Sequence, residues 1–191
     1  MKSFLLKACG AALAAACLGG AGGMLRAQQA DARRGAAETR TQGEARAQSA
    51  EARARFEALR SSEPLKRAAA AWELSKRPAE ARAAVDALLE LLSDATAVDP
   101  GVYRRQDRVN SPYTNTTVGA EAARALAAVG AEAVAPLVDA LGRAEGEARR
   151  NAAWALGAID DRRAVGPLTK TLGADADARV REQAAWALGA L

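Results

Sequence analysis

The sequence has 191 residues, enough for one ordinary domain, and half of them are apolar although only 4% are aromatic. Alanine supplies much of the apolar half, and because alanine favours helices and buries little surface, the composition argues against a strand-rich core. The chain has no histidine, which removes histidine-based catalysis and the commonest metal ligand. Of the net charge of +4, Lys2, Lys7 and Arg26 contribute most, so the remaining chain is nearly neutral and nucleic-acid binding is not expected.

Residues 1–27 have the pattern of a signal peptide. Two lysines flank the start of a short apolar run, and small residues follow it. Because the run is too short to span a bilayer comfortably, we expect cleavage near Ala27 and export to the periplasm or the extracellular space. The alternative is a lipoprotein, since LAAAC ends at Cys17 and loosely matches a lipoprotein box. In that case Cys17 carries a lipid that anchors the chain to a membrane.

Residues 28–62 form a polar segment rich in alanine, arginine and glutamate. Phe56 and Leu59 are its only large apolar residues, so the segment lacks the apolar surface that independent folding requires. Helix-forming residues are concentrated between Glu44 and Arg60. We therefore predict a polar tether followed by a solvated, lone helix.

The segment 63–191 contains a repeated unit. The letters AWALGA occur twice, which places Trp154 and Trp186 in the same context 32 positions apart. A second set of residues recurs with nearly the same spacing, each 31 positions later: Val134, Pro136, Leu137, Leu141 and Gly142. A period in the low thirties built of two short helices is typical of a stacked array. The predicted fold is therefore all-α, a short α-solenoid of stacked antiparallel helix pairs.

In chain order we expect helix pairs at 64–93, 118–142 and 146–173, and a final helix at 177–191. Corresponding positions of these helices are predicted to form the core, and the tryptophans among them are interpreted as packing residues and not as a ligand platform. The predicted core residues are Trp72, Leu126, Trp154, Leu156, Leu168, Trp186 and Leu188.

An insert at 94–117 separates the first pair from the second. Trp72 and Arg124, which occupy corresponding positions, are about twenty residues further apart than one period requires. The insert holds both tyrosines of the chain and several arginines, which are the side chains most enriched at binding hot spots. It is either a contact loop or a loop whose tyrosines fold back on the first repeat. Its candidate contacts are Tyr103, Arg104, Arg105, Arg108 and Tyr113.

The stretch ARVREQAAWALGAL, with Asp177 ahead of Val180 and Arg181, resembles a HEAT repeat of the short bacterial kind, a pattern shared by the PBS-lyase HEAT-like family. The resemblance extends over 64–191 and implies an α-solenoid. Relatives of this fold include a di-iron hydroxylase that relies on His-Glu pairs, and the lack of histidine argues against that activity. Other relatives attach or isomerise phycobilins, and the expected export argues against that role.

The segment that follows the signal peptide contains no catalytic motif, so we predict a non-enzymatic scaffold that binds another protein, without cofactor or metal. Its expected contacts are the insert and three helix residues, Asp139, Lys170 and Thr171, because extended faces of such arrays serve as binding surfaces. Two alternatives stay open. One is a lyase-like or ligand-holding enzyme accessory, which predicts a deep apolar pocket. The other is a structural protein that assembles through its C-terminal helix, or a fragment that ends there.

Overall fold

The computed structural model describes residues 45–104 and 116–191 and contains two compact units, Met1–Ala50 and Glu51–Leu191. Of the first unit, residues 45–50 are described, and they are helical. The predicted signal peptide, the candidate lipidation site Cys17 and residues 28–44 lie outside the described residues. The account below concerns the second unit.

The second unit consists of helices joined by short 3-10 turns, with one small two-stranded ladder in the insert. We call α2, α5, α7 and α9 the A helices, and α3 with α4, α6 and α8 the B helices. The A helices span Pro64–Ser75, Val118–Val129, Gly146–Ile159 and Ala178–Ala190, and the B helices span Pro78–Ala83, Val85–Leu91, Val134–Arg143 and Val165–Ala174. The remaining elements are β1 (Ala97–Val98), η1 (Pro100–Val102), β2 (Thr116–Thr117), η2 (Gly130–Ala133) and η3 (Arg162–Ala164).

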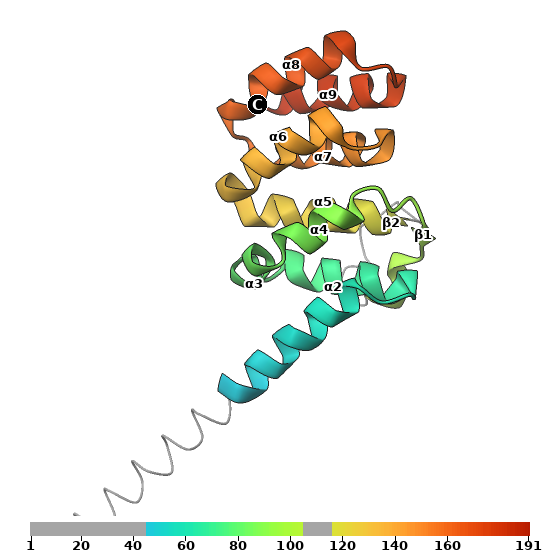
Figure 1. The fold of residues 1–191 in the computed structure, drawn as a ribbon, viewed down its shortest axis with the longest axis vertical. Coiled ribbons are helices and arrows are strands. Elements are labelled where there is room, and N and C mark those ends of the chain that lie inside the picture. Colours follow the sequence, from blue (N-terminus) through green and yellow to red (C-terminus); the bar gives the residue numbers. More distant parts are fainter. Residues whose placement is uncertain (1–44, 105–115) are drawn as a thin grey trace, which may run out of the picture. The chain divides into compact units, whose positions relative to one another are not determined.

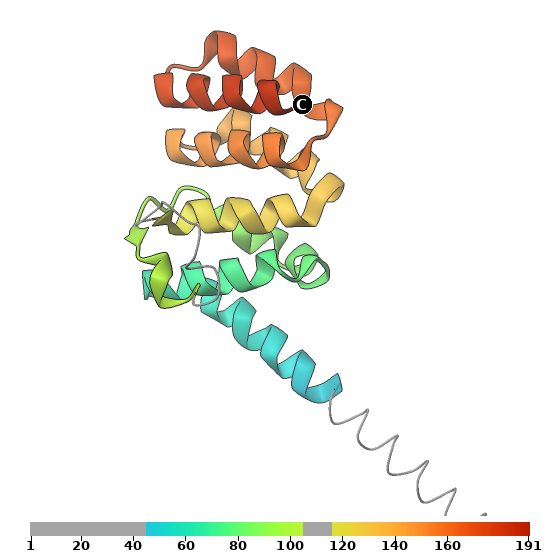
Figure 2. The same cartoon turned by 180° about the vertical axis from the view of Figure 1, so that it is seen from behind.

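The helix pairs stack in the order of the sequence. In Figure 1, α8 and α9 form one level, α6 and α7 the next, and α4 and α5 lie beside them in turn. Figure 2 shows the opposite side, where α5, α7 and α9 run side by side as one layer. The contacts between helices agree with this stacking order, because α7 packs against both α5 and α9 while α5 packs against α2. The prediction of an all-α solenoid of antiparallel helix pairs is confirmed.

Leucines from both helix layers form the core, and alanines of the A helices allow the layers to approach. The stretch Val118–Gly142 is apolar enough to cross a membrane by length and composition, but it folds back on itself as α5, η2 and α6. Its apolar side chains pack against neighbouring repeats. The fully buried leucines are Leu59, Leu74, Leu88, Leu92, Leu126, Leu137, Leu156 and Leu168.

Two local features differ from the expectation. The first B helix is not continuous, since the backbone at Ala84 leaves helical geometry and separates α3 from α4. The end of the polar segment is also not simply solvated, because Leu59 is buried and Phe56 packs against the same core. A bidentate pair between Arg55 and Glu80 of α3, with N–O distances of 2.9 and 3.0 Å, ties this helical turn to the first repeat.

An arginine lies five residues before each tryptophan and links the start of an A helix to the preceding linker. The guanidinium of Arg67 donates to the carbonyl of Ser61 at 2.7 Å, and Arg149 donates to the carbonyl of Ala144 at 2.7 Å. The same side chains reach the acid that follows the B helix of their pair. Arg149 binds both carboxylate oxygens of Asp175, at 2.7 and 2.9 Å. Bidentate pairs of this kind are among the stronger polar interactions in proteins.

We expect Asp175→Asn to lower the free energy of unfolding at pH 7 by about 1–3 kcal/mol, since hydrogen bonds to charged groups contribute in this range. The hydrogen bond from Arg149 holds the pKa of Asp175 below its usual value. A carboxyl group whose pKa is lowered by folding stabilises the fold at pH values above its unfolded-state pKa of about 3.9. This contribution is lost as the pH falls. The difference in the free energy of unfolding between the wild type and Asp175→Asn, measured by urea unfolding, should therefore be smaller near pH 3 than at pH 7. Asp86→Asn, an exposed acid on α4, is the charge-matched control.

Candidate binding groove between the A helices and the insert

The insert begins and ends beside α5. Ala97 of β1 pairs with Thr117 of β2 in an antiparallel ladder, which brings the two ends of the insert together. The hydroxyl of Thr117 accepts a hydrogen bond from the amide of Ala120 at 3.1 Å and so caps α5. The insert is therefore fixed at both ends to the first turn of an A helix.

A buried carboxylate anchors the described part of the insert. Glu121 of α5 is fully buried, the hydroxyl of Tyr103 donates to it at 3.1 Å, and Arg104 forms an ion pair with it. The ring of Tyr103 packs edge-on against Trp72 of α2, with centroids 5.8 Å apart. Burial, followed by the charge of Glu121, raises the pKa of Tyr103, so its hydroxyl stays protonated and remains a donor. Tyr103 thus folds back on the first repeat.

This anchor yields a prediction for Tyr103→Phe. The variant leaves a fully buried carboxylate with one donor fewer, so we expect a loss of about 1–2 kcal/mol in the free energy of unfolding. A double-mutant cycle with Glu121→Gln, measured by urea unfolding, should give a coupling energy of about 1 kcal/mol. Additive effects of the two substitutions would show that the hydroxyl and the carboxylate do not act together.

A groove of about 360 Å³ lies where the insert meets three A helices. The insert and the start of α5 form one wall, and α7 and α9 form the other. Most of its lining residues are polar, and they include three arginines and no acid. The lining residues are Pro100, Arg104, Thr116, Thr117, Ala120, Arg124, Arg150, Asn151, Trp154 and Gln183.

Side chains at corresponding positions of three A helices, Arg124, Trp154 and Trp186, contact one another in a row. The guanidinium of Arg124 lies over the ring of Trp154, 5.4 Å from its centroid. Trp154 stacks on Trp186 of α9, with centroids 6.4 Å apart and planes at 6°. Such cation–π and stacking contacts favour a fixed orientation of the side chains.

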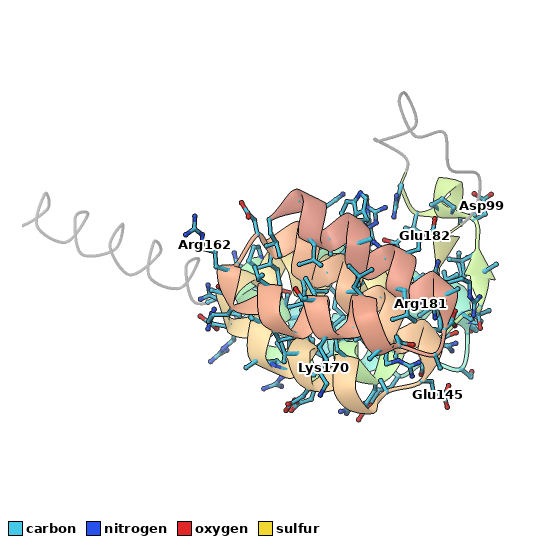
Figure 3. The ribbon with its side chains drawn as sticks, turned by 90° about the horizontal axis from the view of Figure 1, so that it is seen from above. Asp99, Glu145, Arg162, Lys170, Arg181 and Glu182 are labelled. Carbon is cyan, nitrogen blue, oxygen red and sulfur yellow. The ribbon has the colours of Figure 1, made fainter. Side chains whose placement is uncertain are left out.

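A second groove of about 490 Å³ lies on the other layer, between α6 and α8. Lys170 and Thr171 line it together with apolar residues that include Val138 and Leu141. Lys170 is exposed, as Figure 3 also shows, whereas Thr171 is almost fully buried. Asp139 is exposed on α6 but does not line this groove.

The predicted contact residues therefore do not form one site. Arg104 lines the first groove, Lys170 and Thr171 line the second, and Tyr103 is used to anchor the insert. The burial of Thr171 leaves little of its side chain for a partner to touch. Three further candidates lie outside the described residues, namely Arg105, Arg108 and Tyr113.

One predicted core residue is not buried. Trp186 is 50% exposed, and α9 packs mainly against α7 and α8. Trp154 and Leu188 are partly buried and pack against the core. The other predicted core residues are buried: Trp72, Leu126, Leu156 and Leu168.

Several residues of the first groove were not selected from the sequence. Arg124, Arg150, Asn151 and Gln183 come from three different repeats, and the fold brings them together. Arg124 had a visible signal, since it replaces tryptophan at the position shared with Trp154. Within the described residues, no group of three or more acids and cysteines is placed to hold a metal ion.

A family model for HEAT repeats matches residues 113–189, which include α5 to α8 and most of α9. Residues 113–189 of this chain are therefore HEAT repeats. Among solved structures it is similar to a chain of the complex of CpcE and CpcF of phycocyanin lyase from Nostoc sp. PCC7120. That match has 26% identity and a TM-score of 0.44, over 71% of this chain and 51% of the other.

A second similar structure is that of an engineered protein. It has 26% identity and a TM-score of 0.38, over 73% of this chain and 62% of the other. The chain thus spans less than two thirds of the length of either relative. No curated protein matches the chain significantly.

Proposed function

We propose that this HEAT-repeat protein is an exported, non-enzymatic binding module that holds a protein partner in the groove between the A helices and the insert. The observation that carries the proposal is the joint construction of this groove. The insert, which interrupts the repeat period, is anchored by buried Glu121 so that it forms a wall beside three successive A helices. Stacked repeat arrays commonly present extended binding surfaces.

The lining of the groove favours a macromolecular segment over a small ligand. Small-molecule pockets are mostly apolar with a few placed polar groups. Here Pro100, Ala120 and Trp154 are the only apolar residues of the lining. Export is supported by the signal-peptide pattern of residues 1–27, and the intact mass of the purified protein tests it. Cleavage before Gln28 would support export without an anchor, and lipid on Cys17 would identify a lipoprotein.

Affinity capture with a groove-blocking variant tests binding. The full chain with a C-terminal tag serves as bait in the cell-envelope fraction, beside Ala120→Tyr. This substitution fills the groove without changing its charge. Ala135→Tyr places the same side chain on an exposed position of α6 and is the matched control. Circular dichroism establishes that each variant is folded.

We expect a partner that the wild type and Ala135→Tyr retain and Ala120→Tyr loses. Retention of the same partner by Ala120→Tyr would contradict a role for the groove. If no bait retains a protein, the binding-module proposal is wrong, and the ligand-holding alternative becomes the better account.

A further inference from the structure

The groove has more positive than negative charge. Three arginines line it, and two carboxylates face those arginines from outside the lining. Arg104 pairs with Glu121, and Arg150 pairs with Glu147 of its own helix. Arg124 reaches the same Glu121 only at 3.9 Å, with a carboxylate that already accepts from Arg104 and Tyr103. One guanidinium of the three therefore lacks a carboxylate of its own.

Two of these guanidiniums are accessible to a ligand. The side chain of Arg124 is 42% exposed and that of Arg150 is 35% exposed, whereas Arg104 is only 13% exposed. Arg150 lies one helical turn before Trp154, and Arg124 lies over the ring of Trp154, so both belong to the same surface. The accessible charges come from successive repeats and face one groove.

The contact between Arg124 and the ring of Trp154 does not use the N–H donors of the guanidinium. A cation–π contact acts through the charge of the guanidinium and not through hydrogen bonds, so the N–H groups can still bond a carboxylate. The hydroxyl of Thr116 and the amide of Gln183 add neutral hydrogen-bonding partners around the same space. Carboxylates are the protein groups that best match paired guanidinium donors.

We infer that the occupant of the groove is an acidic segment of a partner protein, with carboxylate side chains held between Arg124 and Arg150 above Trp154. This inference rests on the proposed function and specifies the chemistry of the partner. A long polyanion such as nucleic acid fits less well, since its affinity requires a row of cations.

The test measures binding of a fluorescein-labelled decapeptide of glutamate to the full chain at low ionic strength, by fluorescence anisotropy. A decapeptide of glutamine is the neutral probe. Arg124→Glu and Arg150→Glu reverse charges in the groove. Arg162→Glu makes the same change on η3, which Figure 3 places at the opposite end of the unit. Unlabelled succinate serves as a small competitor.

We expect the glutamate peptide to bind, and each groove variant to weaken it by about tenfold or more, which corresponds to about 1.4 kcal/mol. Arg162→Glu should change the affinity by less than about twofold, because exposed distant charges are largely screened. Equal binding of the glutamine peptide, equal weakening by Arg162→Glu, or no binding of the glutamate peptide would each overturn the inference.

If succinate competes as effectively as the unlabelled peptide, the ligand of the groove is a small dicarboxylate, and this result would also overturn the inference. The capture experiment separates this result from failure of the proposed function. If Ala120→Tyr loses a partner but the glutamate peptide does not bind, the groove binds a protein of other chemistry. If the peptide binds as expected but no partner is captured, the groove chemistry stands and the protein-binding role does not.

Discussion

Gly119→Ala is expected to lower the free energy of unfolding by about 2–4 kcal/mol, from overpacking and from the loss of a buried hydrogen bond. A Cβ on Gly119 would lie 2.6 Å from the carbonyl oxygen of Leu92 and 2.7 Å from Nδ2 of Asn151. In the wild type, Asn151 donates to that same carbonyl at 2.9 Å. The methyl group would therefore separate two partners from the first and third repeats, where α4, α5 and α7 meet.

Urea unfolding followed by circular dichroism measures this change. Gly166→Ala is the matched control, since a Cβ at that exposed position of α8 meets nothing within 4 Å. We expect this control to be neutral or slightly stabilising, because alanine is the better helix former. A loss below about 0.5 kcal/mol for Gly119→Ala would mean that the backbone relaxes to admit the methyl group.

The solenoid was predictable because its signal is periodic. Two occurrences of AWALGA and a second set of recurring residues set the length of the unit, and two short helices are the structure that such a length accommodates. Breaks inside a helix have a weaker signal. Nothing in the local sequence around Ala84 distinguishes the division into α3 and α4, both of which contact α5, from a continuous helix.

The groove was only partly predictable, because it is a product of tertiary structure. The excess length of the insert drew attention to Tyr103 and Arg104, but not to the residue that holds them. Glu121 lies in an alanine-rich helix whose other charged residue is Arg124, and Glu121 is fully buried with donors from the insert. Arg150 and Gln183 each lie in a run of consecutive polar residues near the start of a helix, so the sequence does not reveal which of these residues face the insert.

The two AWALGA segments have the same sequence but are packed differently. Gly157 of α7 lies against α9, and a Cβ there would meet both Cα and Cβ of Ala187 at 2.8 Å and Cζ3 of Trp186 at 3.0 Å. Gly189 holds the corresponding place on α9, where a Cβ meets nothing within 4 Å. The same substitution at these two positions should therefore have effects of opposite sign.

Gly157→Ala is expected to destabilise the protein by about 1–3 kcal/mol, because the added methyl group forces α7 and α9 apart. Gly189→Ala should stabilise it by up to about 1 kcal/mol through helix propensity alone. Since each repeat of such an array contacts mainly its neighbours, the damage from Gly157→Ala should concentrate in α9. Hydrogen exchange should show faster exchange there, with little change in α2, and the fluorescence of Trp186 should shift as its stacking on Trp154 is lost. Destabilisation by both variants would show that the two glycines serve the backbone itself and not the contact between repeats.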